Sequence, residues 1–234
     1  MAIKGLAMAG GHPEDLDALG CDWWYAWGCN RNSLSDPRYI PMSRNFEMVD
    51  LPADYSGYLL VGNEPNVREP YGANIKVNPA LCRYTKLVEA YPHAKMVVTG
   101  VSYWDIITSE PWIKAFRDQL ADYGLPKPYG YHLHGYQRVS TADWNLTTHI
   151  EAWWAKMHDW VGLPIWITEY GALSGGTAGL MKLTEWIKLQ PYIERYAAFT
   201  NRSTSADPWS IGDGVNLVDQ QGHLTPSGVY YATA

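Results

Sequence analysis

Two glutamates follow apolar segments of the sequence at the points where polar residues begin. Residues 59–61 form an apolar run that meets Gly62 and then leads into Asn63, Glu64 and Pro65. Because proline cannot continue a central strand, Glu64 is expected at a strand end. Residues 165–168 form a second apolar run, which Glu169 follows directly. One such glutamate often marks only the point where a chain meets water. Two in the same setting predict a pair of carboxyl groups that face one substrate.

A pair of carboxyl groups is the usual chemistry for cleaving a glycosidic bond. One carboxyl group protonates the departing oxygen, and the other attacks the anomeric carbon or activates a water molecule. Retaining enzymes hold the two groups about 5 Å apart, whereas inverting enzymes leave room between them for a water. The spacing of Glu64 and Glu169 along the chain is compatible with either arrangement.

A pair of histidines suggests metal chemistry as an alternative. His132 and His134 are two residues apart on a predicted strand, so their side chains share one face. Such a pair can bind zinc when neighbouring strand ends supply further ligands. Asp105 and Glu169 are conceivable ligands, but no further histidine is well placed. We therefore predict no metal ion and ordinary hydrogen-bonding roles for both histidines, one of them near the glutamates.

Aromatic residues are abundant, with 12 Trp and 17 Tyr, and their flat faces suit either core packing or stacking on sugar rings. Trp23, Tyr25 and Trp27 share one face of a predicted strand, and core packing is expected to account for most of the aromatic residues. Trp27 lies nearest the C-terminal end of its strand and is the first candidate for contact with a sugar. Trp104, in a loop after a later strand, is the second.

The order of predicted elements indicates one fold. Strands are predicted at residues 3–8, 21–27, 39–42, 59–63, 96–99, 131–136, 165–168 and 195–200. Helices are predicted at residues 13–19, 78–91, 111–123, 148–161 and 180–189, and after Thr225. Strands that alternate with helices form a parallel sheet. We therefore predict a single α/β domain over residues 1–234, a compact (β/α)8 (TIM) barrel with short or missing outer helices.

In such a barrel the active site lies at the C-terminal ends of the strands, which is where both glutamates are predicted. A doubly wound open sheet is the structural alternative. The sequence disfavours it, because no glycine-rich phosphate-binding motif follows any predicted strand.

Two motifs resemble a known group of enzymes. Residues 62–65 (Gly-Asn-Glu-Pro) and 166–170 (Trp-Ile-Thr-Glu-Tyr) are similar to the strand-four and strand-seven motifs of the clan A glycoside hydrolases. The chain is most similar to glycoside hydrolase family 128, whose members are compact barrels that cleave β-1,3-glucans. Residues 23–28, 134–136 and 222–230 support this resemblance, which extends over nearly the whole chain.

The resemblance implies roles for three residues of the motifs. Glu64 would be the general acid and base of a retaining mechanism, and Glu169 would be the nucleophile. Glu169 must stay ionised to attack, which requires hydrogen-bond donors, and His134 and Tyr136 are the candidates. Asn63 resembles the clan asparagine that bonds the 2-hydroxyl of the sugar, an interaction that strengthens in the transition state.

Other residues are expected at the edge of the site. Tyr71 follows Glu64 in a loop and should contact substrate or hold that loop, and Asn30 is polar enough to line the cleft. Ala198 stands near the end of the last strand, where related enzymes carry a tryptophan beneath the sugar. The alanine leaves open what forms the floor of this subsite, and with it the exact substrate; Trp209 in the following loop is a candidate to replace the aromatic.

The composition of the chain limits its possible partners and location. The net charge of −6 and the absence of a basic cluster argue against nucleic acid as a partner. No run of eighteen apolar residues predicts a membrane span. The three cysteines are expected to be free buried thiols, with a Cys21–Cys29 bridge as the alternative. We expect a monomer without cofactor, secreted after removal of a leader absent from this chain, with the cytoplasm as the alternative location.

The function predicted from the sequence is endo-acting hydrolysis of β-1,3-glucan polysaccharides or oligosaccharides, because short loops would leave an open cleft. Two alternatives stay open. One is a clan A hydrolase of another β-linked glycan, such as β-1,4-glucan, xylan or mannan. The other is a barrel that binds carbohydrate without cleaving it, although a binding protein has no need of two paired carboxyl groups.

Overall fold

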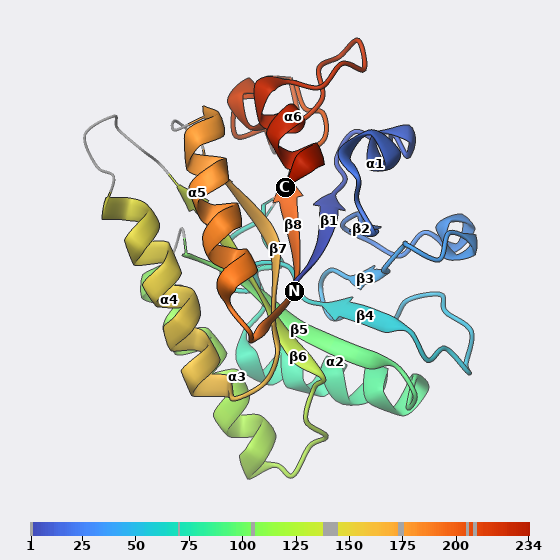
Figure 1. Ribbon diagram of the computed structural model, residues 1–234. Helices are drawn as coiled ribbons and strands as arrows, with labels where there is room; N and C mark the ends of the chain where they lie inside the picture. Colours follow the sequence, from blue (N-terminus) through green and yellow to red (C-terminus); the bar gives the residue numbers. More distant parts are fainter. Residues whose placement is uncertain are drawn as a thin grey trace.

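The strands of the protein form one parallel sheet that curves into a barrel (Figure 1). The computed structural model describes residues 2–69, 71–103, 106–137, 145–172, 176–204, 206–207 and 210–234. Eight strands are paired in the order β2-β1-β8-β7-β6-β5-β4-β3. They are β1 (Ile3–Ala7), β2 (Trp23–Tyr25), β3 (Met42–Ser43), β4 (Tyr58–Val61), β5 (Lys95–Ser102), β6 (Gly130–Gln137), β7 (Ile165–Ala172) and β8 (Ile193–Phe199). The predicted barrel is confirmed.

The segment before β3 closes the barrel against β2. The backbone N–H of Trp24 donates to the carbonyl of Arg38 at 3.0 Å, and the N–H of Ile40 donates to the carbonyl of Trp24 at 2.9 Å. Trp24 and Tyr39 form a parallel bridge between these hydrogen bonds. The predicted strand at residues 39–42 therefore pairs with β2 through its first half, and β3 itself begins only at Met42.

Helices cover most of the barrel, but not the side of β2 and β3 (right in Figure 1). The α-helices are α1 (Glu14–Leu19), α2 (Val77–Ala90), α3 (Ile106–Asp122), α4 (Asn145–Val161), α5 (Gly176–Leu189) and α6 (Pro226–Thr233). Between β2 and β4 the chain forms only a 3-10 helix, η1 (Arg31–Ser35), besides β3. This gap confirms that outer helices are missing.

Helix α3 begins five residues before the predicted start at Pro111. Proline usually opens a helix because it lacks a backbone donor, yet here Pro111 lies inside one. Contacts to the barrel hold the earlier turn in place. The Ser109 hydroxyl donates to the carbonyl of Ser102 at 2.7 Å, and the side-chain amide of Asn66 donates to Thr108 at 2.7 Å. Tertiary contacts therefore outweigh the local signal.

Two apolar layers make up the core. Trp23, Tyr25 and Trp166 fill the interior of the barrel, while Trp24 belongs to the layer between the sheet and the helices. The predicted alternation along β2 is therefore confirmed. A Cβ atom at Gly5 would collide with the indole ring of Trp23, so the glycine makes room for this ring inside the barrel.

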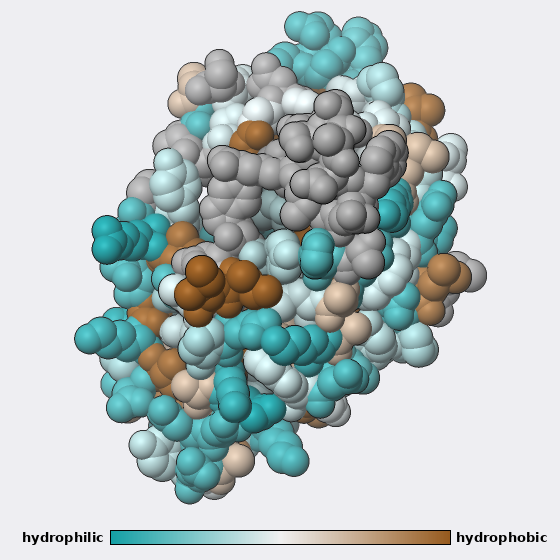
Figure 2. Space-filling model, turned by 90° about the vertical axis from the view of Figure 1, so that its left-hand side faces the viewer, coloured by the Kyte–Doolittle hydropathy of each residue, from teal (hydrophilic) through white to brown (hydrophobic). Residues whose placement is uncertain are grey.

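The outer surface fits a protein that buries its apolar helix faces. On the face that carries α3 and α4, the residues not drawn in grey are mostly hydrophilic, and their apolar side chains form separate patches (Figure 2). Within the described part of the chain, no helix combines the length and apolar character that a membrane crossing needs. Cys21, Cys29 and Cys82 are free thiols, as predicted, but the expectation that all three are buried is wrong, because Cys29 is partly exposed and Cys82 is exposed.

Candidate active site

Glu169 reaches the inside of the barrel because β7 carries one extra residue. Leu133 on β6 pairs with Ile167, but the next residue, His134, pairs with Glu169, so Thr168 has no partner on β6. Ile167 belongs to the outer layer, and strict alternation would turn Glu169 outward as well. The bulge at Thr168 reverses the side-chain direction, and Glu169 lines a cleft at the C-terminal end of the strands.

Glu64 is positioned by a turn directly after β4. Its backbone has a left-handed conformation, with φ of 44°, which is unfavourable for a residue that carries a Cβ. Hydrogen bonds hold this turn. The N–H of Glu64 donates to the carbonyl of Gly100 at 2.9 Å, and the N–H of Asn63 donates to the carbonyl of Arg44 at 2.9 Å. The carboxyl group lines the same cleft as Glu169.

Three side chains donate hydrogen bonds to the carboxyl group of Glu169. Oε1 accepts from Trp27 Nε1 at 2.7 Å and from the Tyr25 hydroxyl at 3.1 Å, and Oε2 accepts from the Tyr136 hydroxyl. Burial raises the pKa of Tyr25 and of Tyr136, and the charge of Glu169 raises both further. Both tyrosines therefore stay protonated and act as donors, which suits a carboxylate that must remain ionised.

His134 lies between the two glutamates and is fully buried. Its Nδ1 is 3.1 Å from Oε1 of Glu64, and its Nε2 is 3.4 Å from Oε1 of Glu169. Burial lowers the pKa of this histidine, but the two carboxylates outweigh burial and raise it above its ordinary value. A protonated His134 can therefore balance negative charge in the cleft.

The pKa of Glu169 is raised above 4.5, chiefly by burial and also by the charge of Glu64. His134, Tyr136 and Trp27 act in the opposite direction and stabilise the ionised form. The site thus holds a buried carboxylate that is costly to ionise, together with the groups that permit its ionisation.

Glu64, His134 and Glu169 could also be considered as metal ligands, since one atom from each lies within 4.8 Å of the others. A metal bound by both carboxylates and the histidine would need one imidazole nitrogen to face both carboxylates. Instead, each nitrogen faces a different carboxylate. This geometry favours a charged imidazole between two carboxylates over a shared metal ion, and the absence of a metal stays a prediction.

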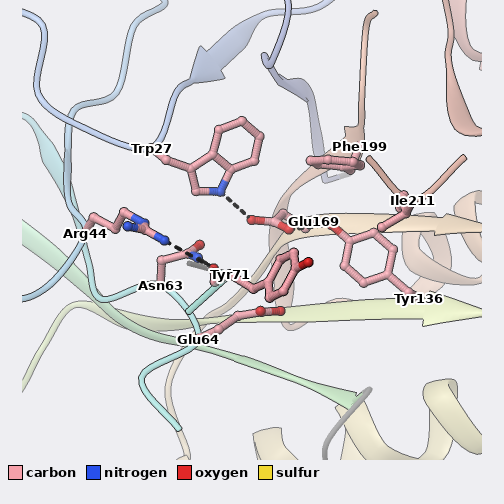
Figure 3. A pocket seen from close by; sticks show the side chains of 9 residues that line it. All are labelled: Trp27, Arg44, Asn63, Glu64, Tyr71, Tyr136, Glu169, Phe199 and Ile211. Atoms are coloured by element: carbon pink, nitrogen blue, oxygen red, sulfur yellow. Dashed lines mark hydrogen bonds between the residues drawn. The ribbon is translucent and has the colours of Figure 1, made fainter. Parts of the chain in front are cut away.

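The cleft between these groups has a volume of about 420 Å³ (Figure 3). Six predicted site residues line it together with three others. The predicted ones are Trp27, Asn63, Glu64, Tyr71, Tyr136 and Glu169. The others are Arg44, Phe199 and Ile211, which sequence reasoning missed.

Tyr25 is a further residue missed as a site residue, although its shared strand face with Trp27 was a usable signal. Arg44 and Ile211 carry no such signal, because each lies outside any recognisable motif. Phe199 was overlooked for a different reason.

Near the end of β8 an aromatic side chain does line the cleft, and it belongs to Phe199, one residue after Ala198. Ala198 faces the outer layer, where its N–H donates to the Tyr231 hydroxyl at 3.2 Å. Phe199 faces inward, and its ring centroid is 5.6 Å from that of Trp27 and 5.7 Å from that of Tyr136. Alternation along β8 explains the shift, since only every second side chain enters the barrel.

Other predicted residues lie elsewhere. Asn30 is exposed outside the residues that line the cleft, and its side chain caps η1 by accepting from the N–H of Asn32 at 3.0 Å. Trp104 and Trp209 lie outside the described residues, as does Asp105.

The family model described as "Glycosyl hydrolase catalytic core" matches residues 6–231. No curated protein sequence matches the chain. Solved structures do match. The three described next align with this chain over nearly the whole of both chains.

The first is an endo-β-1,3-glucanase of glycoside hydrolase family 128, subgroup I, from Amycolatopsis mediterranei in complex with laminaritriose. It is 24% identical, with a TM-score of 0.74 over 100% of this chain and 99% of its own. A curdlan-specific exo-β-1,3-glucanase of subgroup III from Blastomyces gilchristii is 21% identical, with a TM-score of 0.74 over 99% and 98%. A subgroup II endo-β-1,3-glucanase from Sorangium cellulosum is 20% identical, with a TM-score of 0.70 over 100% and 98%. At these identities the likeness establishes a shared fold.

Proposed function

The chain belongs to the family of glycosyl hydrolase catalytic cores, and from this premise we propose that it is a retaining endo-β-1,3-glucanase. The observation that carries the proposal is the spacing of its two carboxyl groups. An oxygen of Glu64 lies within 4.8 Å of an oxygen of Glu169. Retaining glycosidases hold their carboxyl groups about 5–5.5 Å apart, and inverting ones about 6.5–9.5 Å apart. The short spacing supports direct attack by one carboxylate.

In the first step Glu64 donates its proton to the glycosidic oxygen while an oxygen of Glu169 attacks the anomeric carbon. The bond from that carbon to the leaving sugar breaks, and a glycosyl ester with Glu169 forms. Trp27, Tyr25 and Tyr136 hold the attacking carboxylate, which fixes its position before the reaction. Glu64 leaves the first step as a carboxylate.

In the second step Glu64 accepts a proton from a water molecule, whose oxygen attacks the anomeric carbon. The ester bond breaks, Glu169 regains its charge, and Glu64 is again protonated. His134 adjoins both carboxyl groups, so its protonated imidazole can stabilise the negative charge on Glu169 before the ester forms and on Glu64 afterwards. Two inversions at one carbon give net retention.

The remaining cleft residues suit a sugar ring. Phe199 and Trp27 offer aromatic surface beside Glu169, and sugar rings stack on such surfaces. Asn63 is 3% exposed and lines the cleft next to the acid, where it is placed to bond the 2-hydroxyl of the sugar under attack. The choice of β-1,3-glucan is supported by the three relatives, all β-1,3-glucanases, and endo action is the mode of two of them.

The test compares the wild type with Glu169→Gln on laminarin, and then on cellulose, xylan and mannan. Wild type should release reducing ends from laminarin and rapidly lower its viscosity, which marks internal cleavage, while Glu169→Gln should be inactive. Nuclear magnetic resonance should show the β-anomer as the first product. Glu89→Gln, an exposed glutamate on α2, is the matched control and should retain full activity.

Each alternative gives a different result. Release of reducing ends from cellulose, xylan or mannan but not laminarin would reassign the substrate. Binding of laminarin without product would make the protein a carbohydrate-binding barrel. An α-anomer as first product would exclude retention, and loss of activity in EDTA would point to a metal.

We also propose that the barrel acts as one catalytic domain, as a monomer and without a cofactor, on polysaccharide outside the cell. The continuous family match over residues 6–231 supports a single domain. Light scattering at working concentration should give the mass of one chain, 26.4 kDa. A dimer mass would overturn this part of the proposal.

A further inference from the structure

The side-chain amide of Asn63 has its two ends in different surroundings. Its Nδ2 donates to the backbone carbonyl of Tyr71 at 3.4 Å. Its Oδ1 is buried and has no hydrogen-bond partner among the described residues. A buried acceptor without a partner is costly, and Asn63 lines the cleft. The free oxygen therefore points to a donor supplied by a ligand.

Arg44 also contacts the Tyr71 carbonyl. Its Nη2 donates to the carbonyl of Tyr71 at 3.3 Å, and its Nη1 is 3.7 Å from a carboxylate oxygen of Glu69. The side chain is only 25% exposed, and it lies along the wall of the cleft beside Asn63 (Figure 3). Two donors, from the ends of β3 and β4, therefore meet at one acceptor.

The loop around Tyr71 leaves this carbonyl little freedom. The N–H of Ala73 donates to the carbonyls of Asn63 and Glu64, at 2.9 and 3.2 Å. A Cβ atom at Gly72 would collide with the carbonyl of Glu64, so the loop packs directly against the backbone of the acid. The position of the Tyr71 carbonyl is thus fixed relative to both Asn63 and Glu64.

We propose that Arg44 is a positioning residue that, through the Tyr71 carbonyl, orients the amide of Asn63 with its oxygen toward the substrate. An amide turned this way accepts a hydrogen bond, so the group it binds must be a donor. Under the proposed function, on which this inference rests, that group is the 2-hydroxyl of the sugar that Glu169 attacks. Arg44 then acts on the reaction without touching the substrate.

The test combines a protein variant with a substrate variant. Arg44→Met keeps the length of the side chain and removes its donors. The substrates are 4-nitrophenyl β-laminaribioside and its analogue that lacks the 2-hydroxyl on the reacting ring. Arg44→Met should lower kcat/KM about 10- to 100-fold on the parent substrate and less than about 3-fold on the analogue. The two changes should not be additive, because both act on the same contact, the hydrogen bond between Asn63 and the 2-hydroxyl.

Two variants serve as comparisons. Arg44→Lys keeps a cationic donor and should restore part of the activity on the parent substrate. Arg31→Met removes an exposed arginine that pairs with Asp50 outside the cleft, and it should leave both substrates unaffected. An equal loss on both substrates in Arg44→Met would overturn the proposal, since Arg44 would then bind substrate directly or support only the fold.

A second measurement does not depend on turnover. In protein labelled with nitrogen-15, the Asn63 side-chain amide should exchange its hydrogens at least about tenfold faster in Arg44→Met than in the wild type, because its acceptor is no longer held. An unchanged rate would overturn the positioning role. Should the wild type hydrolyse neither laminaribioside nor laminarin, the proposed function fails, while the exchange rate still decides the role of Arg44.

Discussion

His134 on β6 and Glu169 on β7 lie opposite each other, and Nε2 of the histidine is 3.4 Å from Oε1 of the glutamate. The other nitrogen of the same ring is 3.1 Å from Glu64. All three groups are therefore electrostatically linked, and a change in the charge of one alters the electrostatic potential at the other two. During the proposed reaction the negative charge leaves Glu169 as the ester forms and appears on Glu64, while the buried imidazole stays adjacent to both.

Removal of the Tyr136 hydroxyl should shift the pH dependence of the reaction. The pKa of Glu169 is raised by burial, and the Tyr136 hydroxyl opposes this by donating to the charged form. Without the donor the pKa rises further, and the nucleophile becomes protonated at higher pH. In Tyr136→Phe the acid limb of kcat/KM should move to higher pH, and kcat should fall about tenfold to a hundredfold.

The matched control for this prediction is Tyr55→Phe. The Tyr55 hydroxyl donates to the carbonyl of Tyr58 at 2.7 Å and is not among the residues that line the cleft. Its loss should leave the acid limb in place. A pH profile of Tyr136→Phe that matched the wild type would show that the hydroxyl does not stabilise the charge of Glu169.

Replacement of the acid should be reversible by an added nucleophile. Glu64→Ala removes the proton donor and the base but leaves Glu169 and its three donors intact. On a substrate with a good leaving group, such as 2,4-dinitrophenyl β-laminaribioside, the glycosyl ester should still form and then accumulate. Azide should raise turnover at least about tenfold by attacking the ester. The product should be the β-glycosyl azide, and an α-azide would contradict the assignment of Glu169 as nucleophile.

Much of the barrel could be predicted from the sequence because apolar runs and turn residues mark strands and helices independently of the rest of the chain. Glu64 is the clearest case among the site residues, since Pro65 ends its strand whatever lies around it. The missing helices beside β2 and β3 were predictable for the same reason. Helix starts were less so, because contacts such as the one from Ser109 to the barrel depend on the assembled fold.

The details that aim the side chains could not be predicted in this way. No glycine marks the bulge at Thr168, so simple alternation would have turned Glu169 away from the cleft. Along β8, Ala198 lies in the outer layer and Phe199 in the inner one, whereas the resemblance to related enzymes had directed attention to residue 198. Arg44 lies close to Tyr71 only because two loops meet above the barrel, a contact between residues 27 positions apart.

At neutral pH the wild-type protein should be less stable than the Glu169→Gln variant. The pKa of Glu169 is higher in the folded state than the ordinary value of 4.5, mainly through burial. The folded state therefore holds the proton more tightly, and stability falls as the pH rises through the range between the unfolded and folded pKa values. Glutamine fills the same space without a charge, so this loss does not occur in the variant.

Calorimetry should thus give Glu169→Gln the higher Tm at pH 7, and the two proteins should converge as the pH falls below 4.5, where Glu169 is protonated in both states. A gain of about 1 kcal/mol would correspond to about 2–4 °C for a domain of this size. A lower Tm for the variant at pH 7 would mean that the attraction between His134 and Glu169 exceeds the cost of burying the charge.

The aromatic floor of the cleft should depend on Phe199 and not on residue 198. Phe199→Ala removes the ring that contacts Trp27 and Tyr136, so kcat/KM on laminarin should fall about 10- to 100-fold. Phe199→Trp keeps an aromatic surface and should retain most activity.

Ala198→Trp is the matched test of which side of β8 residue 198 faces. It would force an indole ring into the outer layer near Tyr231, and such overpacking should cost about 1–3 kcal/mol of stability. Its activity should not rise, because the added ring lies outside the barrel; an increase in kcat/KM would show that the side chain of residue 198 enters the cleft after all.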